Sequence, residues 1–491
     1  MTNAYVTTGH QIRKRPGLTR VATLETGTTG LRSALGVLNT FYSTGTITHA
    51  NSLFAARKVP HPSSSQAIEE VHYADVFNGY IYCSIEFANG DVKHFYLDDP
   101  GVWLASTVYS ANAFRRPTVQ NGFKYEVTAG GGGSSGGSEP AWPTVVGVTV
   151  VDNALTWTCR AYNITDVNCP NSKSLIKQKQ SIIAIDGENV DYSATSDVKD
   201  WTTANDAGFL ATGLQQAGAT DAIAVAEYQD QLVVFFKDGI QVWFFDPTPT
   251  NIALTQRIFN IGTRYRRAHH QLAGDLVFLA DSGFRSLTIS SQFENMREED
   301  IGSPIDDLVV PYITDNISPI SVYYPRLGQF WSIIGAVAFV YTFSKISKVT
   351  AWSYYEFPFT IDDAATLNGE LYLRSGDAVY RVNDSIYTDD GNTITVSVRL
   401  PFLTAKEEGV LKQFYGVDTV CEGTAEIKFL YDPNDETKET DFVQMLGDTY
   451  PKGLMPMEMT CEKISPYIRH AANEEFSLSR LSLYYHSLGV L

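Results

Sequence analysis

Short apolar runs alternate with tight turns along most of this chain, and helical periodicity is scarce. A clear example is the run Gln231–Phe236, followed by Asp238-Gly239 and the run Ile240–Phe245. Asp-Gly between two apolar runs predicts a β-hairpin, because the tight primed turns need residues with positive φ. The pattern therefore predicts an all-β protein built largely from hairpins.

The predicted hairpins recur at a nearly constant interval. Their turn glycines stand at positions 45, 90, 187, 239, 283, 335 and 376, with spacings of 45, 97, 52, 44, 52 and 41 residues. All but one spacing lie near the ~40–50 residues of a propeller blade. The long interval holds a segment of different composition, residues 103–161, and without it 38 residues remain. We predict a β-propeller-like body of repeated hairpins with an inserted small β module. A β-sandwich with evenly spaced hairpins is the alternative.

These patterns divide the chain into five parts. We expect an N-terminal arm at residues 1–30, the first part of the body at 31–102, the inserted module at 103–161 and the main body at 162–394. Residues 395–491 form a C-terminal β region that closes or extends the body. The last apolar run, Leu481–His486, is expected to return and pair with the N-terminal region.

The inserted module combines a flexible Gly/Ser-rich loop at 130–138 with several large aromatic residues. These aromatics are Trp103, Tyr109, Tyr125, Trp142 and Trp157. Flat aromatic faces can stack on sugars, so carbohydrate contact is one interpretation. Small modules also rely on large aromatics to form a core, and we favour that interpretation.

Composition narrows the range of functions. The chain has 491 residues, 55 of them acidic and 37 Lys or Arg, for a net charge of −18. A protein that wraps DNA needs a basic surface, so this balance argues against one. The five cysteines are odd in number and lack CxxC spacing, which predicts free thiols rather than a zinc site or disulfides. The N-terminus lacks a signal-peptide pattern and the longest apolar run is too short for a membrane span.

Two basic clusters stand out in this acidic chain. Arg13, Lys14, Arg15, Pro16 and Gly17 lie near the N-terminus, where they are a candidate contact for a partner's acidic surface. The alternative is a solvated, mobile end. The second cluster, Arg264, Arg266 and Arg267, is a candidate for a subunit or DNA contact, or for one face of a solvated strand.

Recognisable catalytic and metal-binding motifs are missing from the sequence. It contains no GxGxxG, P-loop, HExxH or GxSxG motif, and most of its nine histidines are scattered. We therefore predict no catalytic residues, no metal and no cofactor.

Several of these segments together resemble a known family. They are Lys14-Arg15-Pro16-Gly17, Asp191-Tyr192-Ser193, Asp200-Trp201-Thr202, and the hairpins at Asp238-Gly239 and Asp281-Ser282-Gly283. They are similar to the tail nozzle proteins of short-tailed bacteriophages, which include packaged-DNA stabilisation proteins and tail tubular protein B. The insert, with Arg116-Pro117, Gly122, Ser138-Glu139-Pro140 and Trp142-Pro143 beside its other aromatics, resembles a small module of phage tail proteins.

The resemblance implies a structural, non-enzymatic protein of the virion tail, assembled in the host cytoplasm. It implies a homohexameric ring below the portal and adaptor that retains packaged DNA and forms the ejection channel. Tail fibres or spikes would attach outside, the basic N-terminal cluster would contact the adaptor, and DNA would pass without sequence-specific binding. An acidic wall would suit this passage. The alternatives are a receptor- or carbohydrate-binding adhesin and a propeller glycosidase. We expect no membrane insertion for the nozzle subunit or for either alternative.

Overall fold

The computed structural model describes residues 1–49, 51–290, 300–445 and 454–490, and the chain is almost entirely β, as predicted. It divides into two compact units. The first unit comprises Met1–Val21, Pro319–Ile361 and Gly369–Leu491, and the second comprises Ala22–Ser318 and Asp362–Asn368. Within the described residues, no helix is both long enough and apolar enough to cross a membrane.

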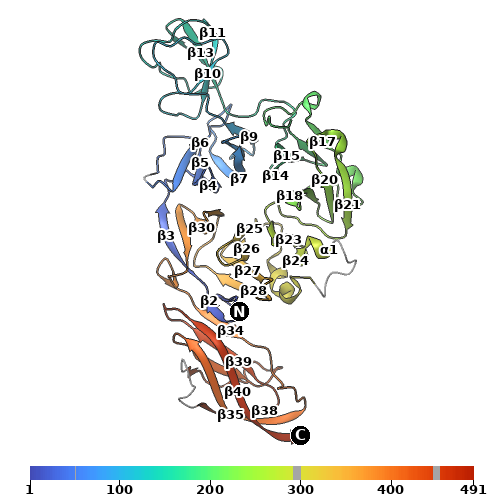
Figure 1. Ribbon diagram of the computed structural model, residues 1–491. Coiled ribbons are helices and arrows are strands. Elements are labelled where there is room, and N and C mark those ends of the chain that lie inside the picture. The colour runs from blue at the N-terminus through green and yellow to red at the C-terminus, as the bar shows by residue number, and fades with distance from the viewer. Residues whose placement is uncertain (50, 291–299, 446–453, 491) are drawn as a thin grey trace. The chain divides into compact units, whose positions relative to one another are not determined.

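The second unit consists of consecutive small sheets (Figure 1). Two of them are four-stranded antiparallel meanders whose strands follow chain order, as in propeller blades. The strands of these two sheets are β14 (Leu175–Gln178), β15 (Ser181–Asp186), β16 (Asn189–Tyr192) and β17 (Gly208–Leu210), then β18 (Ala224–Tyr228), β19 (Gln231–Phe235), β20 (Gly239–Phe244) and β21 (Ala253–Phe259). The hairpins predicted at Gly187 and Gly239 are thus present.

Three-stranded sheets complete this series in the second unit. They are β4 (Thr29–Ala34), β5 (Val37–Tyr42) and β6 (Phe54–Lys58), then β7 (Ile68–Phe77), β8 (Tyr80–Phe87) and β9 (Val92–Leu97), and β22 (His269–Leu272), β23 (Asp275–Ala280) and β24 (Gly283–Ser286). The unit also holds β29 (Asp363–Leu367), the short helices α1 (Leu287–Ser290) and α2 (Asp306–Val309), and the 3₁₀ turns η1 (Thr203–Asn205), η2 (Gly213–Gln215), η3 (Pro249–Asn251), η4 (Ser303–Ile305) and η5 (Val310–Tyr312).

The predicted hairpin around Gly45 is wrong. Strands β5 and β6 pair in parallel, with Leu38 opposite Phe54, so the chain between them returns to the start of β5. The tight turn lies earlier, between β4 and β5, where Leu35 and Gly36 both have positive φ. A glycine between two apolar runs marks a turn, but it does not determine whether the next strand reverses direction.

The insert has its own sheet and its own core. Its strands are β10 (Phe114–Arg115), β11 (Lys124–Ala129), β12 (Thr149–Asp152) and β13 (Leu155–Arg160), paired in the order β10-β11-β13-β12. Its cluster of buried residues runs from Trp103 to Ala161 along the chain. Segment 103–161 is therefore a compact module within the second unit.

The first unit contains a four-stranded meander and a sheet that incorporates the N-terminal region. The meander is β25 (Ile320–Tyr324), β26 (Gln329–Ile334), β27 (Val337–Ser344) and β28 (Val349–Glu356), with the predicted turn at Gly335. In the other sheet β3 (Gly17–Thr23) lies between β31 (Ala378–Asn383) and β32 (Thr388–Asp389). On the outer sides, β30 (Glu370–Ser375) pairs with β31, and β33 (Asn392–Thr393) pairs with β32.

Two further sheets of the first unit share one apolar core. One contains β1 (Ala4–Val6), β2 (Ile12–Lys14), β40 (Ser477–Val490), β35 (Val410–Glu422) and β38 (Met455–Cys461), and the other contains β34 (Val396–Arg399), β39 (Ser465–His470), β36 (Glu426–Leu430) and β37 (Val443–Gln444). Strand β40 pairs with β2 through Ser477 and Leu478, at the start of β40. The run predicted to make this contact, Leu481–His486, pairs with β35 instead, so the C-terminal strand meets the N-terminal region through other residues than predicted.

Residues 1–30 are not a separate arm. They form β1, β2, β3 and the start of β4, and β1 to β3 are integral strands of two sheets. The segment is part of the fold, because β2 and β3 pair with strands more than 300 residues later in the chain.

Candidate functional site

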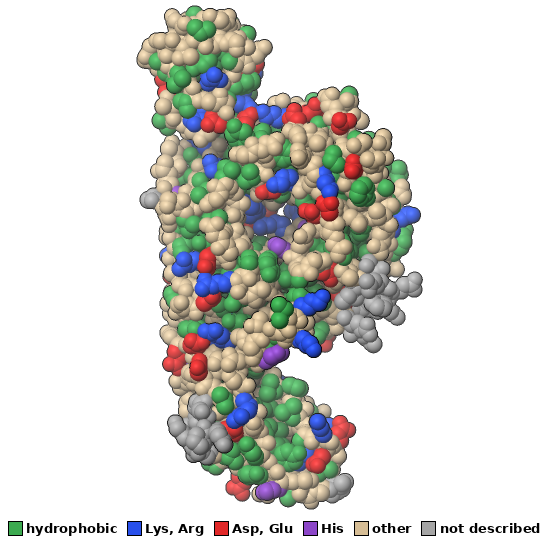
Figure 2. Space-filling model, in the orientation of Figure 1, with side chains coloured by type: hydrophobic (Ala, Val, Ile, Leu, Met, Phe, Trp, Pro, Cys, Tyr) green, Lys and Arg blue, Asp and Glu red, His purple; other side chains and the backbone are tan. Residues whose placement is uncertain are grey.

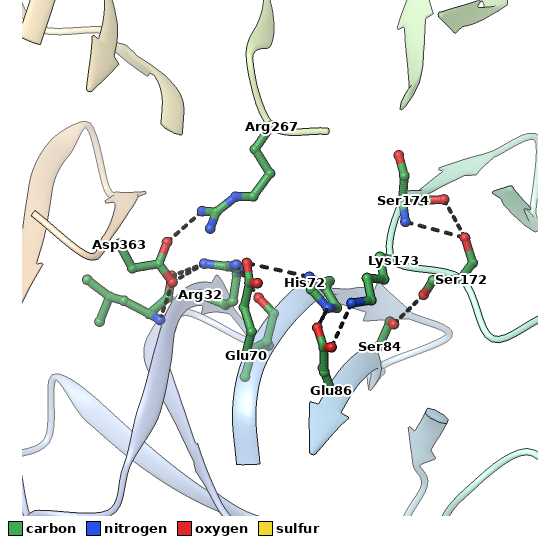
Figure 3. Close-up of polar contacts among 12 residues, drawn as sticks. Arg32, Glu70, His72, Ser84, Glu86, Ser172, Lys173, Ser174, Arg267 and Asp363 are labelled. Carbon is green, nitrogen blue, oxygen red and sulfur yellow. Dashed lines mark hydrogen bonds and ion pairs between the residues drawn. The ribbon is translucent and has the colours of Figure 1, made fainter. Parts of the chain in front are cut away.

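A network of charged side chains in the second unit joins segments that are far apart in the sequence (Figure 3). Its members are Arg32 on β4, Glu70 and His72 on β7, Glu86 on β8, Lys173 just before β14, Arg267 just before β22, and Asp363 on β29. Several sheets thus contribute to one polar cluster, which we call the charge network.

Asp363 is the acidic centre of one half of the charge network. Its carboxylate pairs with Arg267, at 2.6 Å, and with Arg32, and it accepts a hydrogen bond of 2.8 Å from the backbone N–H of Leu31. Burial alone would raise the pKa of Asp363, but the cations of Arg267 and Arg32 hold it below its usual value. This half therefore keeps a buried carboxylate ionised between two guanidinium groups.

His72 is the centre of the other half. Its Nε2 lies 2.9 Å from Glu86 Oε2 and its Nδ1 lies 3.4 Å from Glu70 Oε1, while Lys173 Nζ lies 2.6 Å from Glu86 Oε1. The hydrogen bond with His72 and the nearby cations lower the pKa of Glu70 to about 2, although burial opposes this. Burial would likewise raise the pKa of Glu86, but the hydrogen bonds from Lys173 and His72 lower it.

Within the described residues, Glu70, His72 and Glu86 are the group whose ligand atoms lie close enough together, within 4.8 Å, to hold a metal ion. Carboxylate and imidazole ligands suit zinc and other divalent ions. However, the Lys173 ammonium already contacts Glu86, and Arg267 lies near Glu70. A divalent ion would have to enter beside these cations, so the surroundings suit an ion-pair cluster better than a metal centre.

The charge network holds neighbouring sheets together. Next to it, the Ser84 hydroxyl on β8 donates to the backbone carbonyl of Ser172, at 2.6 Å, and Ser172 donates to the carbonyl of Ser174, at 2.9 Å. These bonds fasten the chain before β14 to the sheet of β7 to β9. These serine bonds are neutral, whereas the ion pairs of the charge network are charge-assisted hydrogen bonds, which are stronger and fix geometry. The network is therefore positioned to hold neighbouring sheets in place.

The spacing of charged residues along the sequence could have indicated part of the charge network, although the overall composition could not. Glu70 and His72 are two residues apart, a spacing that places both side chains on one face of a regular strand, and Glu86 stands opposite Glu70 on the paired strand. The pairing of β7 with β8 is irregular at His72, but the His72 side chain still contacts both carboxylates. Asp363 and Arg32 carry no such signal, because 331 residues separate them.

The N-terminal basic motif is buried, which corrects the expectation that it is displayed to a partner. Arg15 is 1% exposed and its guanidinium pairs with Asp389, which is 2% exposed. Arg15 also donates to Asn3 Oδ1, at 2.9 Å, and its guanidinium lies over the ring of Phe357. A cation that is so fully paired inside the first unit cannot serve as a surface contact.

The other residues of this motif also have internal roles. Lys14 donates to the backbone carbonyl of Ala472, at 2.7 Å, and burial together with neighbouring Arg15 lowers its pKa to about 8. Pro16 is buried, and a Cβ on Gly17 would lie 2.3 Å from the carbonyl oxygen of Thr388, so only glycine fits there. Arg13 alone is partly exposed, and it pairs with Glu475.

The second basic cluster divides in the structure. Arg264 pairs with Asp281 and, at 2.6 Å, with Asp315, and Arg267 belongs to the charge network. Arg266 is exposed, and it lies close enough to Glu70 to help lower the pKa of that carboxyl. The three arginines therefore do not form one anion site, and Arg266 is the member that faces solvent.

The aromatic residues of the insert form its core. Trp103, Tyr109, Tyr125 and Trp157 are buried, and Trp142 is half-buried against Tyr125. The indole N–H groups of Trp103 and Trp157 both donate to the buried carboxylate of Asp152, at 2.8 and 3.0 Å. Their faces are covered by the module itself, which favours the core interpretation over sugar stacking.

Charged side chains on the surface are mixed in sign. On the face drawn in Figure 2, the described Lys and Arg side chains lie among Asp and Glu rather than in one continuous basic patch. This face therefore lacks the continuous basic area through which proteins attract nucleic acid electrostatically.

Comparisons with known proteins give little further information. No family model matches the chain, and no curated protein matches it. Among solved structures, it is similar to one described as the AfRom2 CNH domain, with 11% sequence identity, over 57% of this chain and 88% of that one, at a TM-score of 0.29. A likeness of this degree carries no argument about function.

Proposed function

We propose that this protein is a structural subunit of a phage tail nozzle. In this role six copies form a ring below the portal and adaptor, retain the packaged DNA, and provide the channel through which it leaves the virion. Fibres or spikes attach to the outer side of the ring, and the protein acts in the tail without catalysis, a cofactor or insertion into a membrane.

The pairing of Lys and Arg side chains with the chain's own carboxylates is the observation that supports this proposal most. The chain has a net charge of −18, and many of its basic groups are already engaged by its own carboxylates, among them Arg15, Arg264 and Arg267. Proteins that bind DNA tightly do so largely through Lys and Arg groups, which release counterions from its phosphates. A wall whose cations are neutralised internally lets DNA slide, and the sequence resemblance to nozzle proteins supports the same role.

Sedimentation of the full chain tests this proposal. The protein alone, or mixed with the adaptor of its own phage, is expected to sediment as a species of six times the chain's mass. The complex is expected not to bind free duplex DNA at physiological salt. A chain that stays monomeric under both conditions, or that binds duplex DNA tightly at that salt concentration, would contradict the role of a conduit.

A further inference from the structure

A pocket of about 320 Å³ lies in the second unit, where β6 and β8 meet the base of the insert. Arg57 and Lys58 of β6, Arg116 and Gln120 of the insert, and Tyr162 are among its lining residues. A pocket of this size suits a small ligand or one group of a larger one. Three cations in its wall are conspicuous in a chain with an acidic surplus.

One of these cations is neutralised by its neighbour. Arg116 Nε lies 2.9 Å from Asp99 Oδ1, and Asp99 is the carboxylate in the pocket lining. The pair is partly exposed to solvent. Arg57 and Lys58 are the other two cations in the pocket wall.

The remaining two cations contact neutral acceptors. Arg57 Nε donates to the side-chain oxygen of Asn39, at 2.7 Å, and Lys58 Nζ donates to the backbone carbonyl of Gly45, at 2.6 Å. Among the described residues, no carboxylate lies within ion-pair distance of either one. Burial lowers the pKa of both groups, as expected for cations that lose hydration without gaining a counter-ion.

Tyr162, which lines this pocket, carries a buried hydroxyl. Tyr162 is 4% exposed, and its hydroxyl makes no hydrogen bond of ordinary geometry with the described residues, although Gln120 lies close to it. Nearby Asp98 is engaged by Lys124 and Lys199. Buried polar atoms almost always have a partner, so an unpaired hydroxyl on a pocket wall indicates that a ligand or water completes it.

We propose that this pocket binds an oxyanion, a carboxylate or phosphate group that is free in solution or carried by a sugar. The anion would accept hydrogen bonds from the guanidinium of Arg57, the ammonium of Lys58 and the hydroxyl of Tyr162. The two cations, which contact only neutral acceptors, would thereby gain a counter-ion, and the Tyr162 hydroxyl would gain a hydrogen-bond partner. Charged donors bind oxyanions more strongly than neutral ones, and the two cations supply most of the affinity.

Calorimetric titration of the full chain at low salt tests the site. The probes are inorganic phosphate and galacturonate, with galactose as the neutral counterpart of galacturonate. We expect saturable binding of phosphate, galacturonate or both, at one site per chain, and none of galactose. The probe that binds more tightly tells whether the source is a free phosphate or an acidic sugar.

Variants separate this site from general attraction to surface cations. Arg57→Gln and Lys58→Gln should each weaken binding about tenfold or more, and Tyr162→Phe, which keeps the ring, about threefold to tenfold. Lys237→Gln is the matched control, because it removes an exposed charge elsewhere in the same unit and should leave the affinity unchanged. Circular dichroism checks that each variant is folded.

Two results would overturn the proposal. One is the absence of saturable binding for both anions. The other is binding that the folded variants Lys58→Gln and Tyr162→Phe leave as tight as in the natural chain, since the anion would then lie elsewhere.

Discussion

Arg15 is a residue whose surroundings differ sharply from what its sequence neighbours suggest. It stands among other basic residues near the N-terminus, yet it is buried beside Asp389, 374 residues away in the chain. No local pattern in the sequence pairs these two residues. The burial of this arginine therefore depends on the tertiary fold, and could not be predicted from the basic run.

The Arg15→Ala variant tests the importance of this pair. Leaving Asp389 buried without its partner is expected to cost about 3–5 kcal/mol of unfolding free energy. Urea unfolding, followed by hydrogen exchange of peptides from the first unit, measures the loss. Arg20→Ala is the control, because Arg20 forms an exposed pair with Asp390, and it should have no measurable effect. Equal effects of the two variants would show that burial of Arg15 contributes nothing.

Glu70 predicts a pH dependence of stability. Its pKa is about 2 in the folded protein, against about 4.3 for a glutamate in an unfolded chain. A lowered pKa stabilises the fold above the unfolded value, and this contribution is lost as the pH falls through about 2. Melting temperatures between pH 5 and 2 should therefore decline less steeply in Glu70→Gln than in the natural chain.

Glu69→Gln provides the matched control for this measurement, because Glu69 is the exposed neighbour of Glu70 on β7. It should leave the pH profile as it is. If Glu70→Gln and Glu69→Gln gave the same profile, the charge network would not be the source of the acid sensitivity.

Among the elements, local turn signals predicted most hairpins correctly but failed at Gly45, and they carried no information on long-range strand pairing. The hairpins at Gly187, Gly239 and Gly335 follow from turn chemistry within a few residues, and the structure contains all three. The parallel pairing of β5 with β6 and the pairing of β2 with β40 have no local signature. The charge network was predictable only in part. The two-residue spacing of Glu70 and His72 is a local pattern in the sequence, whereas the contact of Asp363 with Arg32 is not.

The N-terminal strands are expected to be necessary for the first unit to fold. Deleting residues 1–20 removes β1, β2 and most of β3, together with Lys14 and Arg15, from two sheets. Trypsin should therefore cut the first unit of the truncated protein rapidly, while the second unit stays resistant. Protease resistance equal to that of the full chain would restore the interpretation of this segment as a dispensable arm.

The insert is expected to be separable. It has its own sheet and its own buried core, so replacing residues 103–161 by a short Gly/Ser linker should leave the rest of the second unit folded. Hydrogen exchange of β14 to β21 compares the shortened protein with the full chain. Loss of protection in those strands would show that the insert belongs to the core of the unit.

At the scale of the whole molecule, the proposed role depends on charge and assembly. An acidic chain with many paired cations suits a passage for DNA, because its net negative charge repels the phosphates and opposes adhesion at the wall. Salt limits the reach of this repulsion to ~8–10 Å under physiological conditions. Composition argues against a DNA-wrapping protein. The assembly itself depends on contacts between copies, which neither composition nor hairpin spacing can specify.

Electron micrographs of the purified chain, alone and mixed with the head-to-tail adaptor of its own phage, test the central claim most directly. We predict class averages of a sixfold ring with an open central channel in at least the mixed sample. Single particles the size of one chain in both samples, or closed assemblies without a channel, would contradict the proposal that this protein is a nozzle subunit.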